Sequence, residues 1–110
     1  MAVQNLHKGV FIGLYDVNRK PIHEGDVIRY RNFRAIVIFN EFENNWTMVH
    51  VDAYNDMQRH PYCRGMYLED NNSKLSDFLI KHWSIQVIDN IYINPAQLGD
   101  DSMLAYSVGA

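Results

Sequence analysis

Cysteine is almost absent from this chain of 110 residues, which has a single thiol at Cys63. One cysteine cannot form an internal disulfide, and a chain without a disulfide framework is typical of a reducing cytoplasm. Long hydrophobic runs are absent too, because no window approaches the roughly 20 apolar residues of a membrane span, and residues 1–11 lack a signal-peptide core. We therefore expect a soluble, cytoplasmic protein without a membrane partner.

Recognisable catalytic motifs are also missing. The chain contains no phosphate-binding loop, dinucleotide fingerprint, nucleophile elbow or metalloprotease helix. Acidic pairs such as Glu69 with Asp70 are typical of solvated surface, and general acid–base catalysis would need them to converge on a pocket. The sequence favours a non-enzymatic protein that has no catalytic residues and no cofactor.

Metal-ligating residues are scattered. Among the histidines, only His60 lies close to another soft ligand, Cys63. Such a pair is half of a zinc site, and no second Cys or His pair follows at a conventional spacing. We interpret His60 and Cys63 as loop residues and predict no metal site.

Apolar residues, in contrast, are plentiful enough for one self-sufficient domain. Hydrophobic residues make up 47% of the chain, which can therefore bury a core without disulfides or metal. No repeat, low-complexity tract or linker divides residues 1–110, so we interpret them as a single domain. Segment 100–110 starts acidic and continues with large apolar residues, and we expect it to dock on its own domain or on a neighbouring subunit.

Charge is unevenly distributed along a chain whose net charge is −3. Residues 1–40 contain six basic and three acidic residues, whereas residues 41–110 contain four basic and ten acidic ones. This polarity would steer an anionic partner to one face, or align copies of the protein head to tail. We expect a homo-oligomer on this basis.

Basic and aromatic residues are interleaved between positions 19 and 34. Such a face would track a nucleic-acid backbone while an aromatic ring stacks on a base, as in small barrels that bind single strands. The alternative is a solvated sheet face whose arginines pair with nearby carboxylates, and the acidic net charge favours this alternative. The candidate nucleic-acid or partner face comprises Arg19, Lys20, Arg29, Tyr30, Arg31, Phe33 and Arg34.

The first half of the chain has the pattern of turns and strands. Turn-forming residues at 16–19 and 24–26 lead into an alternating strand at 27–31. Asn44-Asn45 is typical of a two-residue hairpin turn, which predicts Ile36 opposite Ala53 and Ile38 opposite Val51. One face of that hairpin would pack on the core, and the other would meet water or a partner.

The second half predicts one helix and one strand. Residues 53–72 are expected to be irregular, with at most a short strand near 66–68. Asn72 or Ser73 would cap a helix to about Trp83, with Leu75, Phe78, Leu79 and His82 at helical spacing.

Alternation over 84–94 then predicts the clearest strand, with Ile85, Val87, Ile91 and Ile93 on one face. Asn94 before Pro95, with Gln97 as a capping-box partner, predicts a helical turn near 95–98. The expected fold is mainly β, with α+β as an option. It would be a curled antiparallel sheet or a small β-barrel, covered by one helix near 73–83.

Two motifs bracket most of the chain. The first contains Phe11-Ile12-Gly13-Leu14-Tyr15-Asp16, then Asn18, Lys20, Ile22 and Glu24-Gly25-Asp26-Val27. The second is Val87-Ile88-Asp89-Asn90-Ile91-Tyr92-Ile93-Asn94-Pro95, followed by Leu98. In order and separation, the pair resembles the YopX family of bacteriophage and prophage proteins.

The resemblance implies a small, β-rich, often oligomeric protein of a bacterial host cell, from a family without an established biochemical role. The family-motif residues, which we expect to be structural, are Gly13, Asp16, Asn18, Glu24, Gly25, Asp26, Asn90, Tyr92, Asn94 and Pro95.

Three residues depart from the family pattern. Arg19 and Asp89 stand where the family usually has glycine, and His23 stands where it tends to have tyrosine. Asp89 would place a carboxylate on an apolar strand face, where an unpaired charge is costly. We favour a β-bulge in which Asp89 adopts the left-handed conformation and points outward. The alternative is a buried carboxylate with a basic partner.

Together these observations predict a phage accessory protein that is not an enzyme and that acts by self-association and by binding phage or host proteins. The alternative function is nucleic-acid binding by a small β-barrel through the face at Arg19–Arg34.

Overall fold

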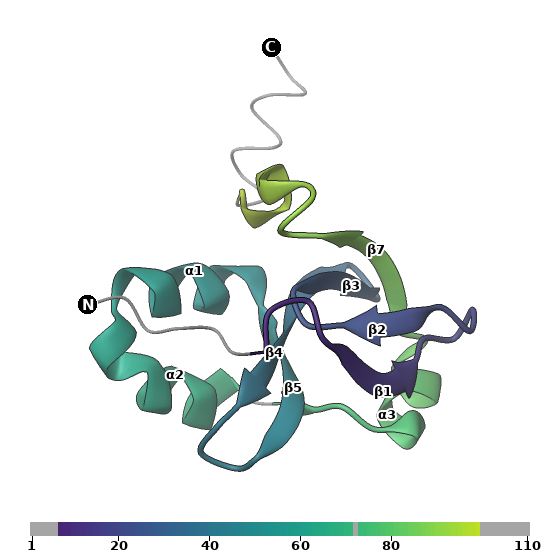
Figure 1. The fold of residues 1–110 in the computed structure, drawn as a ribbon, viewed down its shortest axis with the longest axis horizontal. Helices are drawn as coiled ribbons and strands as arrows, with labels where there is room; N and C mark the ends of the chain where they lie inside the picture. Colours follow the sequence, from purple (N-terminus) through teal and green to yellow (C-terminus); the bar gives the residue numbers. More distant parts are fainter. Residues whose placement is uncertain (1–6, 72, 100–110) are drawn as a thin grey trace.

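An antiparallel sheet of five strands forms the centre of the computed structural model, which describes residues 7–71 and 73–99 (Figure 1). Its strand order is β6-β5-β4-β3-β7, and a second sheet pairs β1 with β2. The strands are β1 (Phe11–Tyr15), β2 (Pro21–His23), β3 (Asp26–Tyr30), β4 (Phe33–Asn40), β5 (Asn45–His50), β6 (Ser73–Lys74) and β7 (Gln86–Asn90). The helices are α1 (Val51–Arg59), α2 (Arg64–Asn71) and α3 (Asp77–Trp83), with 3-10 turns η1 (Pro61–Cys63) and η2 (Pro95–Leu98).

This architecture confirms the mainly β fold with antiparallel pairing. The sheets formed by the described residues are open, so the curled sheet rather than the closed barrel is correct. The helical turn predicted near 95–98 is present as η2, and α3 covers the sheet. The segment predicted to dock, 100–110, lies outside the described residues.

Both faces of the central sheet are buried. On one face Val27 and Ile36 pack with residues of α1 and α2, and on the other Ile28 and Val37 pack with residues of β2 and α3. Figure 1 shows α1 and α2 on one side of β3–β5, and β1, β2 and α3 on the other. The prediction that one face of the hairpin meets water or a partner is therefore wrong, because both faces pack within the domain. Strands buried on both faces read as continuous apolar runs, as residues 35–38 do.

The β4–β5 hairpin has a longer turn than its sequence predicts. The turn spans residues 41–44, because the Asn40 Oδ1 accepts the backbone N–H groups of Phe42 at 3.0 Å and Glu43 at 3.2 Å. Ile38 consequently lies opposite Thr47 rather than Val51, and Ile36 opposite Val49 rather than Ala53. The shift is an even number of residues, so each side chain keeps its predicted face.

Residues 53–71 are mainly helical rather than irregular. Helix α1 follows β5 directly, and the His50 imidazole accepts the N–H of Asp52 at its start. Its buried residues Val51, Tyr54 and Met57 lie at helical spacing on the sheet side. The short strand predicted near 66–68 is part of α2.

Helix α3 begins later than predicted. Its N-cap is Ser76, whose hydroxyl accepts the N–H of Leu79 at 3.1 Å, whereas Ser73 pairs with Met48 as part of β6. The helix therefore turns Ile80 into the core. Phe78, predicted to face the sheet with His82, is 76% exposed and stacks on that imidazole on the outer side.

Strand β7 contains a β-bulge and ends at Asn90. Val87 pairs with Ile28, but Asp89 pairs with Val27, so one extra residue of β7 lies between the two pairs. The bulge moves Asp89 off the face that Val87 occupies. Its backbone φ is not positive, so the left-handed part of the prediction is wrong. Beyond the strand, Ile93 is 84% exposed, so the predicted continuous face is wrong as well.

Candidate functional site

The two family motifs meet in space at Glu24 and Tyr92, although 68 residues separate them. The Tyr92 hydroxyl donates to Glu24 Oε1 at 2.7 Å, and the backbone N–H of Gly9 donates to the same oxygen at 2.9 Å. The Glu24 side chain is buried, and the Lys8 ammonium lies 4.7 Å from the centroid of the Tyr92 ring. This arrangement holds a buried carboxylate with donors from two distant segments.

Gly25 lies directly under the Tyr92 ring. Its φ is +87°, and a Cβ added there would lie 2.3 Å from a ring carbon. Its N–H donates to the Val37 carbonyl at 2.8 Å, and its carbonyl accepts the N–H of Ile91 at 3.0 Å. Glycine is required here both for backbone conformation and for space.

Asp26 and Asp16 are also buried carboxylates that accept backbone or amide N–H groups. Asp26 accepts the N–H of His23 at 2.7 Å and the Asn90 amide at 3.0 Å. Asp16 accepts the N–H groups of Asn18 and Lys20 through Oδ1. Its Oδ2 accepts the N–H of Val87 at 2.9 Å, so it also satisfies a backbone donor at the edge of β7.

Asp89 accepts three hydrogen bonds next to η2. The Asn94 amide donates at 2.8 Å, the N–H of Asn90 at 2.9 Å and the Gln97 amide at 3.0 Å. The Asn94 bond, followed by the other two, lowers the pKa of the Asp89 carboxyl. The bulge is thus confirmed and a basic partner is not needed. The predicted capping box is wrong, because the amides of Asn94 and Gln97 are directed to Asp89 instead.

The residues of the predicted basic and aromatic face are divided by the central sheet. Arg29 and Arg34 are cross-strand partners on the face covered by α1, and Tyr30 and Phe33 are partners on the opposite face, with ring centroids 5.6 Å apart. Arg34 donates to the Gln97 carbonyl, the Gln97 side chain and the Gly99 carbonyl, so it fastens η2 to β4.

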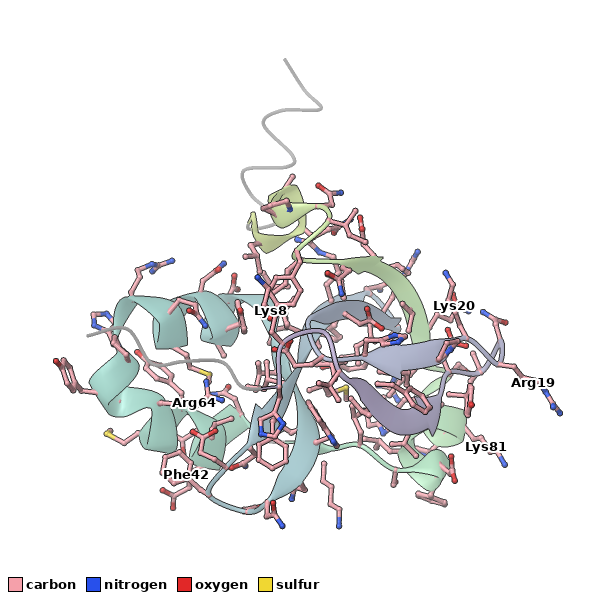
Figure 2. The ribbon with its side chains drawn as sticks, in the orientation of Figure 1. Lys8, Arg19, Lys20, Phe42, Arg64 and Lys81 are labelled. Carbon is pink, nitrogen blue, oxygen red and sulfur yellow. The ribbon has the colours of Figure 1, made fainter. Side chains whose placement is uncertain are left out.

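The remaining basic residues of that face lie in two turns. The Arg31 guanidinium is 4.4 Å from the Trp83 ring centroid, in a cation–π contact with α3. Arg19 and Lys20 lie at the tip of the β1–β2 turn, which projects from the molecule (Figure 2). The N–H of Val17 in this turn donates to the Ile85 carbonyl, so β7 separates the turn from β3 and Arg29.

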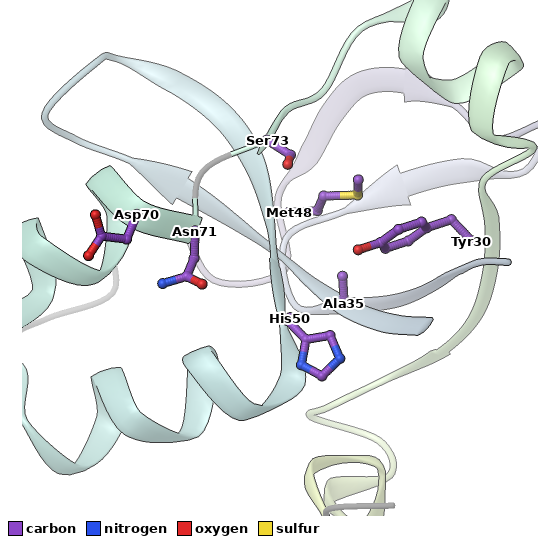
Figure 3. Close-up of a pocket in the computed structure, with 7 residues that line it drawn as sticks. All are labelled: Tyr30, Ala35, Met48, His50, Asp70, Asn71 and Ser73. Atoms are coloured by element: carbon purple, nitrogen blue, oxygen red, sulfur yellow. The ribbon is translucent and has the colours of Figure 1, made fainter. Parts of the chain in front are cut away.

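A small groove lies between Tyr30 and the end of α2 (Figure 3). Its volume is about 190 Å³ and its lining is mainly polar. The His50 imidazole beside it already accepts the N–H of Asp52, which stabilises the start of α1. The lining residues are Tyr30, Ala35, Met48, His50, Asp70, Asn71 and Ser73.

Large apolar side chains are exposed on η1, on α2 and in the β4–β5 turn, which contacts α2. Tyr62 is 101% exposed, Met66 is 67% exposed and Phe42 is 65% exposed. The Phe42 ring lies over Gly65, and Arg64 binds both Glu41 and the Phe39 carbonyl, which holds the turn against α2. We call Phe42, Tyr62 and Met66 the α2 apolar patch.

Sequence reasoning missed this patch because it treated 53–72 as irregular. The four-residue spacing of Tyr62 and Met66 was the available signal, since it places both on one side of a helical segment. His60 and Cys63 lie in the connection from α1 to α2, and Cys63 is exposed. Among the described residues, no group of His, Cys, Asp and Glu side chains is placed to hold a metal ion.

The comparison with known families covers both motifs. The family model described as YopX protein matches residues 5–99, which include both motifs. The chain belongs to the YopX family. No curated protein and no solved structure matches it. In the part of this YopX family protein that the structure describes, no helix has both the length and the apolar character needed to cross a bilayer.

Proposed function

We propose that this YopX family protein is a non-enzymatic accessory protein of a bacteriophage or prophage, and that it self-associates and binds other proteins in the host cytoplasm. The observation that carries this proposal is the α2 apolar patch. Its three side chains are among the most exposed large apolar side chains of the described residues. Large apolar side chains exposed on neighbouring elements are characteristic of protein–protein contact sites.

The occupant of the patch is a second copy of the chain. The uneven charge favours this occupant, because the basic segment 1–40 of one copy is complementary to the acidic segment 41–110 of another. The Arg64–Glu41 pair at the edge of the patch adds a polar rim to its apolar centre. An apolar centre with a polar rim is the usual composition of a protein interface.

Light scattering coupled to size-exclusion chromatography tests this proposal. We expect the wild type to have a mass above the 12.9 kDa monomer and the Phe42→Ser/Met66→Ser variant to shift toward the monomer. Burial of each such side chain contributes about 1.5–3 kcal/mol, so the double variant should weaken association by at least about a hundredfold. Deletion of 100–110 tests the contribution of the terminal segment separately.

Phe78→Ser is the matched control, because Phe78 is an exposed aromatic residue on a different helix. It should leave the mass unchanged. A wild type that stays monomeric at all concentrations, with or without 100–110, would refute self-association. An oligomer that persists in the Phe42→Ser/Met66→Ser variant would exclude the α2 apolar patch as its interface.

A further inference from the structure

The outer side of the β1–β2 hairpin carries a row of aromatic rings. Ile12 and Leu14 of β1 pack inward on the core, while Phe11 and Tyr15 are 43% and 52% exposed. The Phe11 ring centroid lies 5.5 Å from that of Tyr15 and 5.8 Å from that of His23 on β2. Three ring systems therefore form one continuous exposed surface, which we call the hairpin aromatic row.

A glycine bulge brings these rings together. In a regular strand, residues four positions apart are separated by about 13 Å, which would keep Phe11 and Tyr15 out of contact. The β1–β2 register shifts between these two residues, and Gly13 at the centre has a φ of +88°. A Cβ at Gly13 would meet nothing within 4 Å, so glycine is required here for its backbone conformation and not for space.

The charge around the row is positive, although the whole chain is acidic. Lys8, Arg19 and Lys20 are exposed, and Figure 2 shows all three on the N-terminal segment and the β1–β2 turn. The carboxylates of residues 7–25 are those of Asp16 and Glu24, and both are buried and hydrogen-bonded. Among residues 7–71 and 73–99, no ion pair involves Arg19 or Lys20.

We propose that the hairpin aromatic row, with Arg19 and Lys20, binds single-stranded nucleic acid. Unpaired bases stack on exposed aromatic rings, whereas the faces of paired bases are covered by their neighbours in a duplex. Tyr15 lies opposite Pro21, the residue after Lys20, so a base stacked on the row has cations beside it for its phosphates. This site is independent of the α2 apolar patch and differs from the predicted face, because it uses Phe11 and Tyr15 in place of Arg29–Arg34.

Fluorescence anisotropy with a labelled oligothymidylate of about 12 nucleotides tests this site, since related single-strand sites span about 4–16 nucleotides. We expect the wild type to bind this strand more tightly than a duplex of equal length. Phe11→Ser/Tyr15→Ser should weaken binding by about tenfold or more for each ring lost. Tyr15→Phe keeps a stacking ring and should retain the affinity.

The cations are tested through the dependence of affinity on salt. Each phosphate contact with a single strand contributes about 0.7 to the slope of log affinity against log salt concentration. Arg19→Gln/Lys20→Gln removes two such contacts and should therefore weaken binding and reduce the magnitude of that slope by about 1.4. Arg29→Gln/Arg31→Gln, which alters the face predicted from sequence, should leave binding unchanged, as should Phe42→Ser/Met66→Ser.

A wild type that does not bind the single strand at low salt would overturn the proposal. So would unchanged affinity in a Phe11→Ser/Tyr15→Ser variant whose thermal unfolding shows a folded protein. Loss of binding in Arg29→Gln/Arg31→Gln, with Phe11→Ser/Tyr15→Ser unaffected, would assign the site to the predicted face instead.

Discussion

The inner and outer sides of the β1–β2 hairpin have opposite characters. On the inner side, Asp16 and Glu24 are buried, and their carboxylates accept hydrogen bonds from segments far along the chain. On the outer side, Phe11, Tyr15 and Arg19 are exposed. Most residues of the family motif therefore serve to hold the N-terminal and C-terminal segments of the fold together. In the proposed single-strand site, binding would depend on the residues that point away from these contacts.

The structural role of the buried motif residues can be tested most strongly at Gly25. Gly25→Ala should lower the free energy of unfolding by about 3 kcal/mol or more, because the new Cβ would meet the Tyr92 ring in a left-handed backbone. Denaturant unfolding monitored by circular dichroism measures the effect.

Gly13→Ala is the matched control for backbone strain. Gly13 also has a positive φ, but no atom lies within 4 Å of the added Cβ, so the loss should be about 1–2 kcal/mol. Equal losses for the two variants would show that the Tyr92 contact does not restrict Gly25.

Local sequence signals predicted this fold well where a single segment determines the outcome. The Asp16 turn, the Gly25 turn and the alternation of Val27 and Ile28 were identified, since each depends on residues a few positions apart. The fold class followed from these strands. The family motif also identified Glu24 and Tyr92, but only the structure shows that their side chains meet.

The errors arise where distant residues decide the local structure. The Asn40 side chain extends the β4–β5 turn, and Asn44-Asn45 alone does not reveal this. Helix α1 follows a strand without a conventional N-cap, because a histidine side chain fills that position at His50. The alternation of the strand at 27–31 does place Arg29 and Tyr30 on opposite faces. It does not show that both faces are buried, because that burial depends on helices from elsewhere in the chain.

A smaller effect on stability is expected from substitution of Asp89, a partly exposed residue of the second motif. Its pKa is lowered from the ordinary value of 3.8, first by the Asn94 hydrogen bond. A carboxyl whose pKa is lower in the folded state stabilises the protein above its unfolded pKa. That contribution is lost as the pH falls through the folded pKa.

Asp89→Ala should therefore destabilise the protein at neutral pH, and the difference from wild type should shrink as the pH falls below about 4. Urea unfolding at a series of pH values measures this difference. Glu69→Ala removes an exposed carboxylate of α2 and is the matched control. A constant difference between Asp89→Ala and wild type at every pH would show that the charge of Asp89 does not contribute.

The smallest expected change in stability concerns Arg19, which links the fold to the outer surface. Its φ is +65°, a conformation in which glycine is unstrained. Arg19→Gly should raise the free energy of unfolding by about 0.5–1 kcal/mol, since relief of strain exceeds the added flexibility of the unfolded chain. Arg31→Gly is the control, because Arg31 has a φ of +54° but also contacts Trp83. In Arg31→Gly, loss of the cation–π contact should cancel most of the stability gained from relief of backbone strain.

The same variant separates stability from binding. If Arg19 contacts a phosphate, Arg19→Gly should be more stable than wild type and yet bind the oligothymidylate more weakly at low salt. A gain in stability together with a loss of affinity would mean that the strained backbone of Arg19 is retained because its side chain binds a phosphate. If Arg19→Gly were less stable, the strain argument would be wrong, and if it bound as tightly as wild type, Arg19 would not belong to the site. Because stability and affinity are measured separately, either failure can be assigned to the fold or to the surface.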